Sequence, residues 1–177
     1  MALVLHRRHD MDLDELLRRC TVLERRAAGV YRMFAARTRH LPDVCALWTG
    51  LAREEEVHAH TVERAASWLD PGQGFHTSLD GWQEALDEIE ARLADAERPE
   101  IGSEVRRQLI AALGLERTEL DTLFNRLLVL VPAAEQPHDA AEHTAPLLAA
   151  AARYASDPGV ALEAALLHAR RRLQAAP

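Results

Sequence analysis

Residues 44–69 read VCALWTGLAREEEVHAHTVERAASWL, and their pattern is the clearest indication of how the chain folds. Taken at steps of three and four residues, the stretch has one apolar stripe that a glutamate and a histidine interrupt. The stripe consists of Val44, Trp48, Leu51, Glu55, His58, Val62, Ala65 and Leu69. Apolar residues at this spacing form the core-facing side of a bundle helix. We therefore predict a helix over 42–69, with Pro42 in its first turn.

Two further segments have the same pattern, each with one central glutamate. The stripe of 12–38 holds Leu13, Leu17, Cys20, Glu24, Ala27, Tyr31 and Phe34, and that of 103–131 holds Leu109, Leu113, Glu116, Leu120, Leu123 and Leu127. Burial of an unpaired carboxylate in such a place costs folding free energy on the order of several kcal/mol, because the charge loses its hydration. A bound cation would offset that cost, and carboxylates with imidazole suit iron, manganese or zinc better than calcium or magnesium.

The first two helices are expected to bring their ionisable groups together. A tight turn near His40 makes an antiparallel hairpin, in which Glu24 lies opposite Val57, between Glu55 and His58. These three side chains can converge on one point, and this is the strongest inference from the sequence. Acids off the stripes are expected to face solvent, namely Glu54, Glu56, Glu63 and Asp121.

Composition limits the class of protein. The chain has 177 residues, 48% of them hydrophobic, which suffices for one domain, and strong helix formers dominate without any period-two stretch. We therefore predict an all-α fold. A net charge of −7 argues against a nucleic-acid partner. No apolar run reaches the roughly 20 residues that span a bilayer, and the first residues lack a signal-peptide pattern, so a cytoplasmic location is expected. Cys20 and Cys45 fit no zinc pattern and are interpreted as packing thiols.

Turn signals divide a single domain, 1–177, into six predicted helices. These cover 12–38, 42–69, 78–97, 103–131, 146–155 and 158–174. The predicted architecture is a four-helix bundle of two hairpins with a helical crossover and an extra C-terminal helix. Its parts are a first hairpin at 12–69, a crossover with a short helix at 70–102, a second helical half at 103–155 and a C-terminal helix at 156–177.

Three short motifs give the chain a resemblance to a known family. Residues 23–31 (LERRAAGVY) and 52–58 (AREEEVH) resemble the first hairpin of the rubrerythrin branch of ferritin-like di-iron carboxylate proteins. That family pairs a helix-one glutamate, followed seven residues later by an aromatic residue, with a helix-two ExxH. The matching residues here are Glu24, Tyr31, Glu55 and His58. Residues 115–119 (LERTE) are similar to the third-helix signature, in which Glu116 matches a metal ligand and Glu119 a second glutamate.

The second half follows the family pattern less closely. The family has another ExxH or ExxEH there, and the nearest match is residues 139–143 (DAAEH), where Ala140 or Asp139 replaces the glutamate. A turn near Ala134 would leave Glu116 facing a residue about nine positions from His143, roughly 14 Å along a helix. The fourth bundle helix is either this region or 158–174, whose stripe offers no ligand.

The resemblance implies a non-haem iron protein with two iron ions, or one if the fourth helix has lost its carboxylate. Glu55 and Glu116 would bridge, Glu24 would be terminal, His58 would hold one iron, and Glu142 or His143 would complete the other. The implied activity is of the peroxidase or ferroxidase type, with peroxide or oxygen as oxidant. Tyr31 would tune or protect the site, or simply fill the core. The rubredoxin-like CxxC pairs of classical rubrerythrins are missing.

Two alternatives remain open on the sequence alone. In one, the chain is a degenerate, metal-free helical scaffold that binds a partner, which Ala140 and the proline-containing region 132–146 favour. In the other, the half-site of Glu24, Glu55 and His58 meets its copy across a two-fold axis, as in encapsulated ferritins. A homodimer or higher homo-oligomer is expected.

Overall fold

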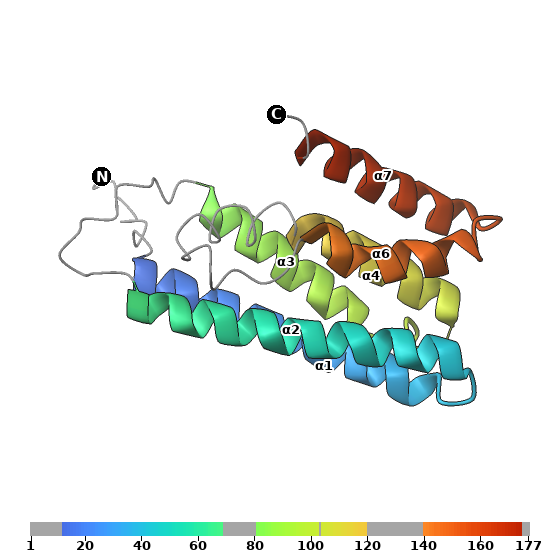
Figure 1. Ribbon diagram of the computed structural model, residues 1–177, viewed down its shortest axis with the longest axis horizontal. Helices are drawn as coiled ribbons and strands as arrows, with labels where there is room; N and C mark the ends of the chain where they lie inside the picture. The colour runs from blue at the N-terminus through green and yellow to red at the C-terminus, as the bar shows by residue number, and fades with distance from the viewer. Residues whose placement is uncertain (1–11, 69–80, 103, 120–139, 175–177) are drawn as a thin grey trace, which may run out of the picture.

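The computed structural model describes residues 12–68, 81–102, 104–119 and 140–174. Six helices and no strand make up the regular structure of this part of the chain (Figure 1). The helices are α1 (Leu13–Arg37), α2 (Pro42–Trp68), α3 (Trp82–Ala96), α4 (Val105–Glu119), α6 (Ala140–Ala152) and α7 (Pro158–Gln174). The prediction of an all-α fold is confirmed. Among these helices, none combines the length and the apolar character that a membrane crossing requires.

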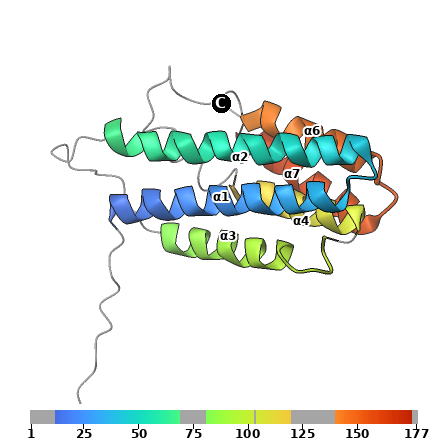
Figure 2. The same ribbon diagram turned by 90° about the horizontal axis from the view of Figure 1, so that it is seen from below.

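The α1–α2 hairpin is the base on which the other helices pack. The two helices run side by side along their whole length, and their mutual contact is the most extensive between any two of the described helices (Figure 1). Figure 2 shows α1 between α2 and α3, and α3 also contacts α4. On the other side, α6 contacts both α2 and α4. Helices α1, α2, α4 and α6 therefore surround a common interior.

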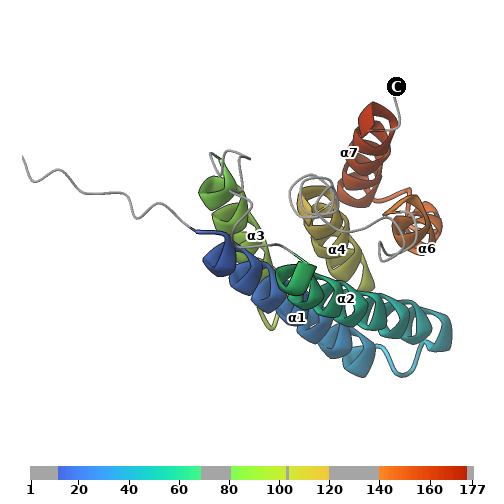
Figure 3. The same cartoon turned by 60° about the vertical axis from the view of Figure 1, so that its left-hand side comes forward.

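The last helix lies outside this arrangement. Figure 3 shows α7 on the far side of α4 and α6 from the hairpin, and its main contacts are with these two helices. Its buried residues, Val160 and Leu167, join the core from that side. Helix α6 thus lies against both α2 and α4, whereas α7 covers α4 and α6 from outside.

The first hairpin forms where the sequence predicts it. Asp12 caps α1, because its side chain accepts a hydrogen bond of 2.8 Å from the backbone N–H of Glu15. Towards the turn, aromatic rings fill the interior: Tyr31 stacks on Trp48 with ring centroids 6.0 Å apart, and Phe34 meets Trp48 edge-on at 5.3 Å. These rings are fully buried. They fix the hairpin next to the ionisable residues described below.

Two predicted helices differ from the structure. The helix predicted for 146–155 instead begins at Ala140 and ends at Ala152, with Pro146 inside it. Proline removes one backbone hydrogen bond from a helix, yet burial of Leu147 and Ala151 beyond it offsets that loss. The helix predicted for 103–131 begins at Val105 and is described as far as Glu119, so the rest of that prediction lies outside the described residues.

Candidate metal centre

Five ionisable side chains from four helices meet in the interior of the bundle. Glu24 comes from α1, Glu55 and His58 from α2, Glu116 from α4 and His143 from α6. The three glutamates are at most 1% exposed, and His58 is 7% exposed. Charged groups are rarely buried to this degree unless they are paired or bound to a metal.

The hairpin supplies the first half of the centre. Glu55 and His58 are three residues apart on α2, so that both side chains lie on the same face of the helix. His58 Nδ1 lies 2.9 Å from Glu55 Oε2 and 3.7 Å from Glu24 Oε2 on α1. The three groups that the hairpin geometry predicted to converge do converge.

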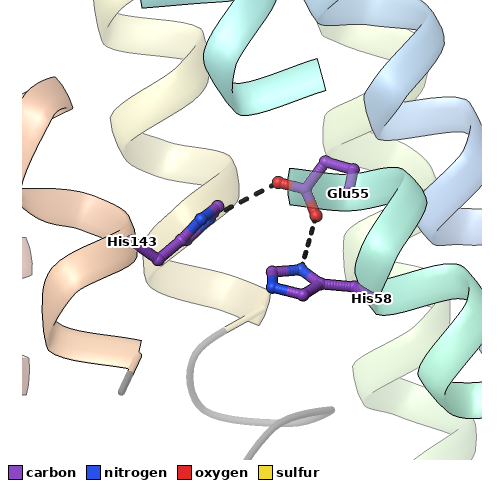
Figure 4. A group of neighbouring side chains, drawn as sticks. All are labelled: Glu55, His58 and His143. Atoms are coloured by element: carbon purple, nitrogen blue, oxygen red, sulfur yellow. Dashed lines mark hydrogen bonds and ion pairs between the residues drawn. The ribbon is translucent and has the colours of Figure 1, made fainter. Parts of the chain in front are cut away.

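The second half comes from α6 and α4. His143 Nε2 lies 2.8 Å from Glu116 Oε2 and 3.4 Å from Glu55 Oε1, so the imidazole lies between the carboxylates of α4 and α2. The rings of His143 and His58 meet edge to face, with centroids 4.9 Å apart. Figure 4 shows the Glu55 carboxylate between the two imidazoles, each of which points one ring nitrogen towards it.

Ligand atoms of Glu55, His58 and His143 all lie within 4.8 Å of one another, a spacing at which one ion can contact all three. The geometry therefore provides a carboxylate–histidine–histidine group able to hold a metal ion. Oxygen and imidazole nitrogen in this combination suit iron, manganese and zinc, whereas calcium and magnesium prefer oxygen alone. Glu24 and Glu116 add two further buried carboxylates at the edge of the group.

Tyr31 borders the centre on the side of the aromatic core. Its hydroxyl donates a hydrogen bond of 2.6 Å to Glu116 Oε1, while its ring stacks on Trp48. The phenol therefore fixes one oxygen of Glu116, and the other oxygen faces His143. This contact gives Tyr31 a defined place beside the candidate ligands.

The electrostatics of the centre are those of closely packed acids and imidazoles. Burial raises the pKa of Glu24 to about 8, against a smaller opposite effect of the nearby His58. Burial also acts to raise the pKa of Glu55, but its close contacts with the imidazoles of His143 and His58 outweigh burial and lower that pKa. Burial acts to lower the pKa of His58, yet Glu24 and Glu55 raise it to about 9. Burial acts to lower the pKa of His143, but the nearby carboxylates of Glu116, Glu54 and Glu55 outweigh burial and raise this pKa well above its usual value.

The carboxylates keep oxygens that protein donors do not satisfy. Among the described residues, neither oxygen of Glu24 accepts a hydrogen bond, and Glu55 Oε1 is likewise without one. Buried polar atoms are nearly always paired, so an unpaired carboxylate inside a bundle needs a compensating cation or a proton. Both the buried carboxylate oxygens without hydrogen bonds and the combination of oxygen and imidazole nitrogen donors fit a transition-metal ion.

Most of the residues singled out in the sequence meet at this point. The structure brings together Glu24, Tyr31, Glu55, His58, Glu116 and His143. The side chains of Glu119 and Glu142 lie outside the described part of the chain, as does Asp121. For those three the sequence-based predictions are without a structural counterpart.

One residue of the centre was missed. The prediction that Glu54 merely faces solvent is wrong, because its Oε2 is hydrogen-bonded to Nδ1 of His143 although its side chain is 44% exposed. Glu54 thereby holds the ring nitrogen that points away from Glu116. Carboxylates that hold the outer nitrogen of a metal-binding histidine are a common feature of metal centres. The sequence signal is slight: an acid directly before Glu55.

Comparisons with known proteins give no further guide to identity. No protein-family model matches the chain, and comparisons with curated proteins and with solved structures also found no match.

Proposed function

We propose that the chain is an iron-binding protein of the ferritin-like, rubrerythrin-type class, which oxidises ferrous iron with peroxide or oxygen. The single observation behind this proposal is the convergence of Glu55, His58 and His143, whose ligand atoms lie within 4.8 Å of one another in a buried site. The Glu24 carboxylate beside them, neither oxygen of which accepts a hydrogen bond from the described residues, supports a cationic occupant. Contributions from four helices agree with the ligand arrangement of carboxylate-bridged bundle sites.

The residues have distinct roles in this proposal. Glu55 lies between the two imidazoles and Glu116 lies beside His143, so these two carboxylates would serve as the bridging ligands, and Glu24, next to His58, would serve as a terminal ligand. His58 offers Nδ1 and His143 offers Nε2. Iron, when bound, would supply the electrons that reduce peroxide or oxygen.

Protons must leave the centre when the metal enters. Glu24, His58 and His143 have raised pKa values, and each must be deprotonated to act as a ligand. Glu54 can direct His143, because it accepts the Nδ1 proton and leaves Nε2 free for coordination. Tyr31 holds Glu116 in place, and the buried aromatic rings behind it restrict access of water.

The test is the metal content of protein expressed in iron-supplemented medium, measured by elemental analysis. A dinuclear site predicts about two irons per chain. A measured ratio of about one iron per chain would instead indicate a mononuclear or shared centre. Glu55→Gln should lose the metal. Glu56→Gln is the matched control, because Glu56 is the next residue on α2 and pairs with Arg32 at the surface.

A second matched pair uses the histidines of α2. His58→Ala should lose metal, whereas His60→Ala should keep it, since His60 is exposed and pairs with Glu63. Loaded wild-type protein should then oxidise added Fe²⁺ on addition of peroxide or oxygen, and Glu55→Gln should not. Absence of bound metal, together with equal melting temperatures in all four variants, would contradict the proposal and leave a metal-free helical scaffold.

A further inference from the structure

We propose that a pocket on the outer side of the α1–α2 hairpin binds a phosphoryl group. The pocket has a volume of about 450 Å³, and it lies between the last turns of α1 and the first half of α2. Three arginines line it, Arg32 from α1, Arg39 from the turn between α1 and α2, and Arg53 from α2, together with one acid, Glu56. This site is separate from the buried carboxylates, and the proposal does not depend on a metal.

The charge of the pocket is positive once its internal ion pair is taken into account. Arg32 directs both terminal nitrogens at Glu56 Oε1, each at 2.8 Å, so these two charges largely cancel. Within the described ranges, Arg39 and Arg53 have neither an ion pair nor a side-chain hydrogen bond with another residue. Two guanidinium groups thus remain available at one pocket.

Free arginines are unusual along this hairpin. The chain carries a net charge of −7, and earlier arginines of α1 are already engaged. Arg18 pairs with Glu15, and Arg25 pairs with Glu63. Unneutralised positive charge in a hollow of an acidic protein attracts anions and raises their local concentration.

The shape and charge of the pocket favour one class of ligand. Two guanidinium groups match the two charges and three oxygens of a phosphoryl group, whereas a single carboxylate would leave one arginine unmatched. The remaining wall includes the small side chains of Ala36 and Ala52 and the hydroxyl of Thr49. The volume of the pocket falls within the range of roughly 300–1,000 Å³ that is typical of small-molecule sites. The pocket therefore has room for a compact organic group attached to the phosphate.

The pocket can be tested with two probes on the full chain, inorganic phosphate and phenyl phosphate, by isothermal titration calorimetry at pH 7.5 and low salt. Wild-type protein should bind at least one of them saturably, at one site per chain. Stronger binding of phenyl phosphate would indicate a phosphate ester as ligand, and equal binding would indicate free phosphate. The double variant R39Q/R53Q should bind at least tenfold more weakly, as expected from loss of charge-assisted hydrogen bonds.

The matched control is R18Q/R25Q, which removes two exposed arginines of α1 from outside the pocket and should keep wild-type affinity. Both double variants change exposed residues, so equal melting temperatures should show that the fold is intact. Non-saturable binding of both probes by wild-type protein would overturn the proposal. Equal affinity in R39Q/R53Q and wild-type protein would overturn it too.

Discussion

Replacement of Glu24 by glutamine should change how the stability of the metal-free protein depends on pH. The Glu24 carboxyl is 1% exposed, and burial raises its pKa from 4.5 to about 8 in the folded chain. Because the folded state holds the proton more tightly than the unfolded state, the free energy of unfolding falls as pH rises from about 4.5 to about 8. Above that range the folded chain carries a buried carboxylate, whereas Glu24→Gln does not.

The size of the effect follows from the pKa of Glu24. A rise from 4.5 to about 8 corresponds to about 5 kcal/mol, at roughly 1.4 kcal/mol per pH unit. This value already includes the favourable effect of the neighbouring His58, whose own pKa of about 9 keeps it largely protonated while Glu24 ionises. We therefore expect wild-type protein to lose about 3–5 kcal/mol more than Glu24→Gln between pH 5 and pH 9.

Urea unfolding in the presence of a chelator, at pH 5, 7 and 9, would measure this difference. Glu63→Gln is the control, because Glu63 is exposed on α2 and pairs with Arg25, so its pH profile should follow wild type. Parallel profiles for wild type and Glu24→Gln would contradict the raised pKa of the buried Glu24 carboxyl group. The same variant should bind metal more weakly, since the group that destabilises the empty site would be a ligand of the proposed metal.

Three further predictions concern the centre. Glu54→Ala should lower metal affinity roughly 10- to 100-fold, because His143 loses the acceptor of its Nδ1; Glu54→Gln, which can still accept, should lose less, and calorimetry with Mn²⁺ showing equal losses would contradict this role. Wild-type affinity for Mn²⁺ should rise between pH 6 and pH 9, because Glu24, His58 and His143 have raised pKa values and must lose protons on binding; an affinity that is constant or falls over that range would be inconsistent with these ligands. Tyr31→Phe should reduce the free energy of unfolding by about 1–3 kcal/mol, since a buried carboxylate loses its donor; unchanged stability in urea would show that this hydrogen bond is unimportant.

The first half of the centre could be predicted from the sequence because local rules determine it. The three-residue spacing of Glu55 and His58 fixes a common helix face, and the short turn after α1 fixes the register that places Glu24 opposite. Neither step requires knowledge of the remainder of the chain.

The second half could not be placed in the same way. The position of His143 depends on where α6 begins. Because proline is tolerated in the first turn of a helix but disfavoured in its interior, the sequence placed the start of this helix at Pro146, whereas the helix begins at Ala140. Because α6 begins earlier, His143 lies in its first turn and contacts Glu116. The hairpin turn assumed near Ala134 had placed these two residues far apart. Glu54 was missed for a related reason, because its partner is 89 residues away and on the misplaced helix.

Anomalous X-ray diffraction at the iron absorption edge, from crystals of protein loaded with Fe²⁺, is the most direct test of the central claim. We expect anomalous density at bonding distance from Glu55, His58 and His143, with Glu24 or Glu116 turned towards it. Crystals that hold these side chains in their mutual hydrogen bonds, with no anomalous density between them after iron loading, would contradict it.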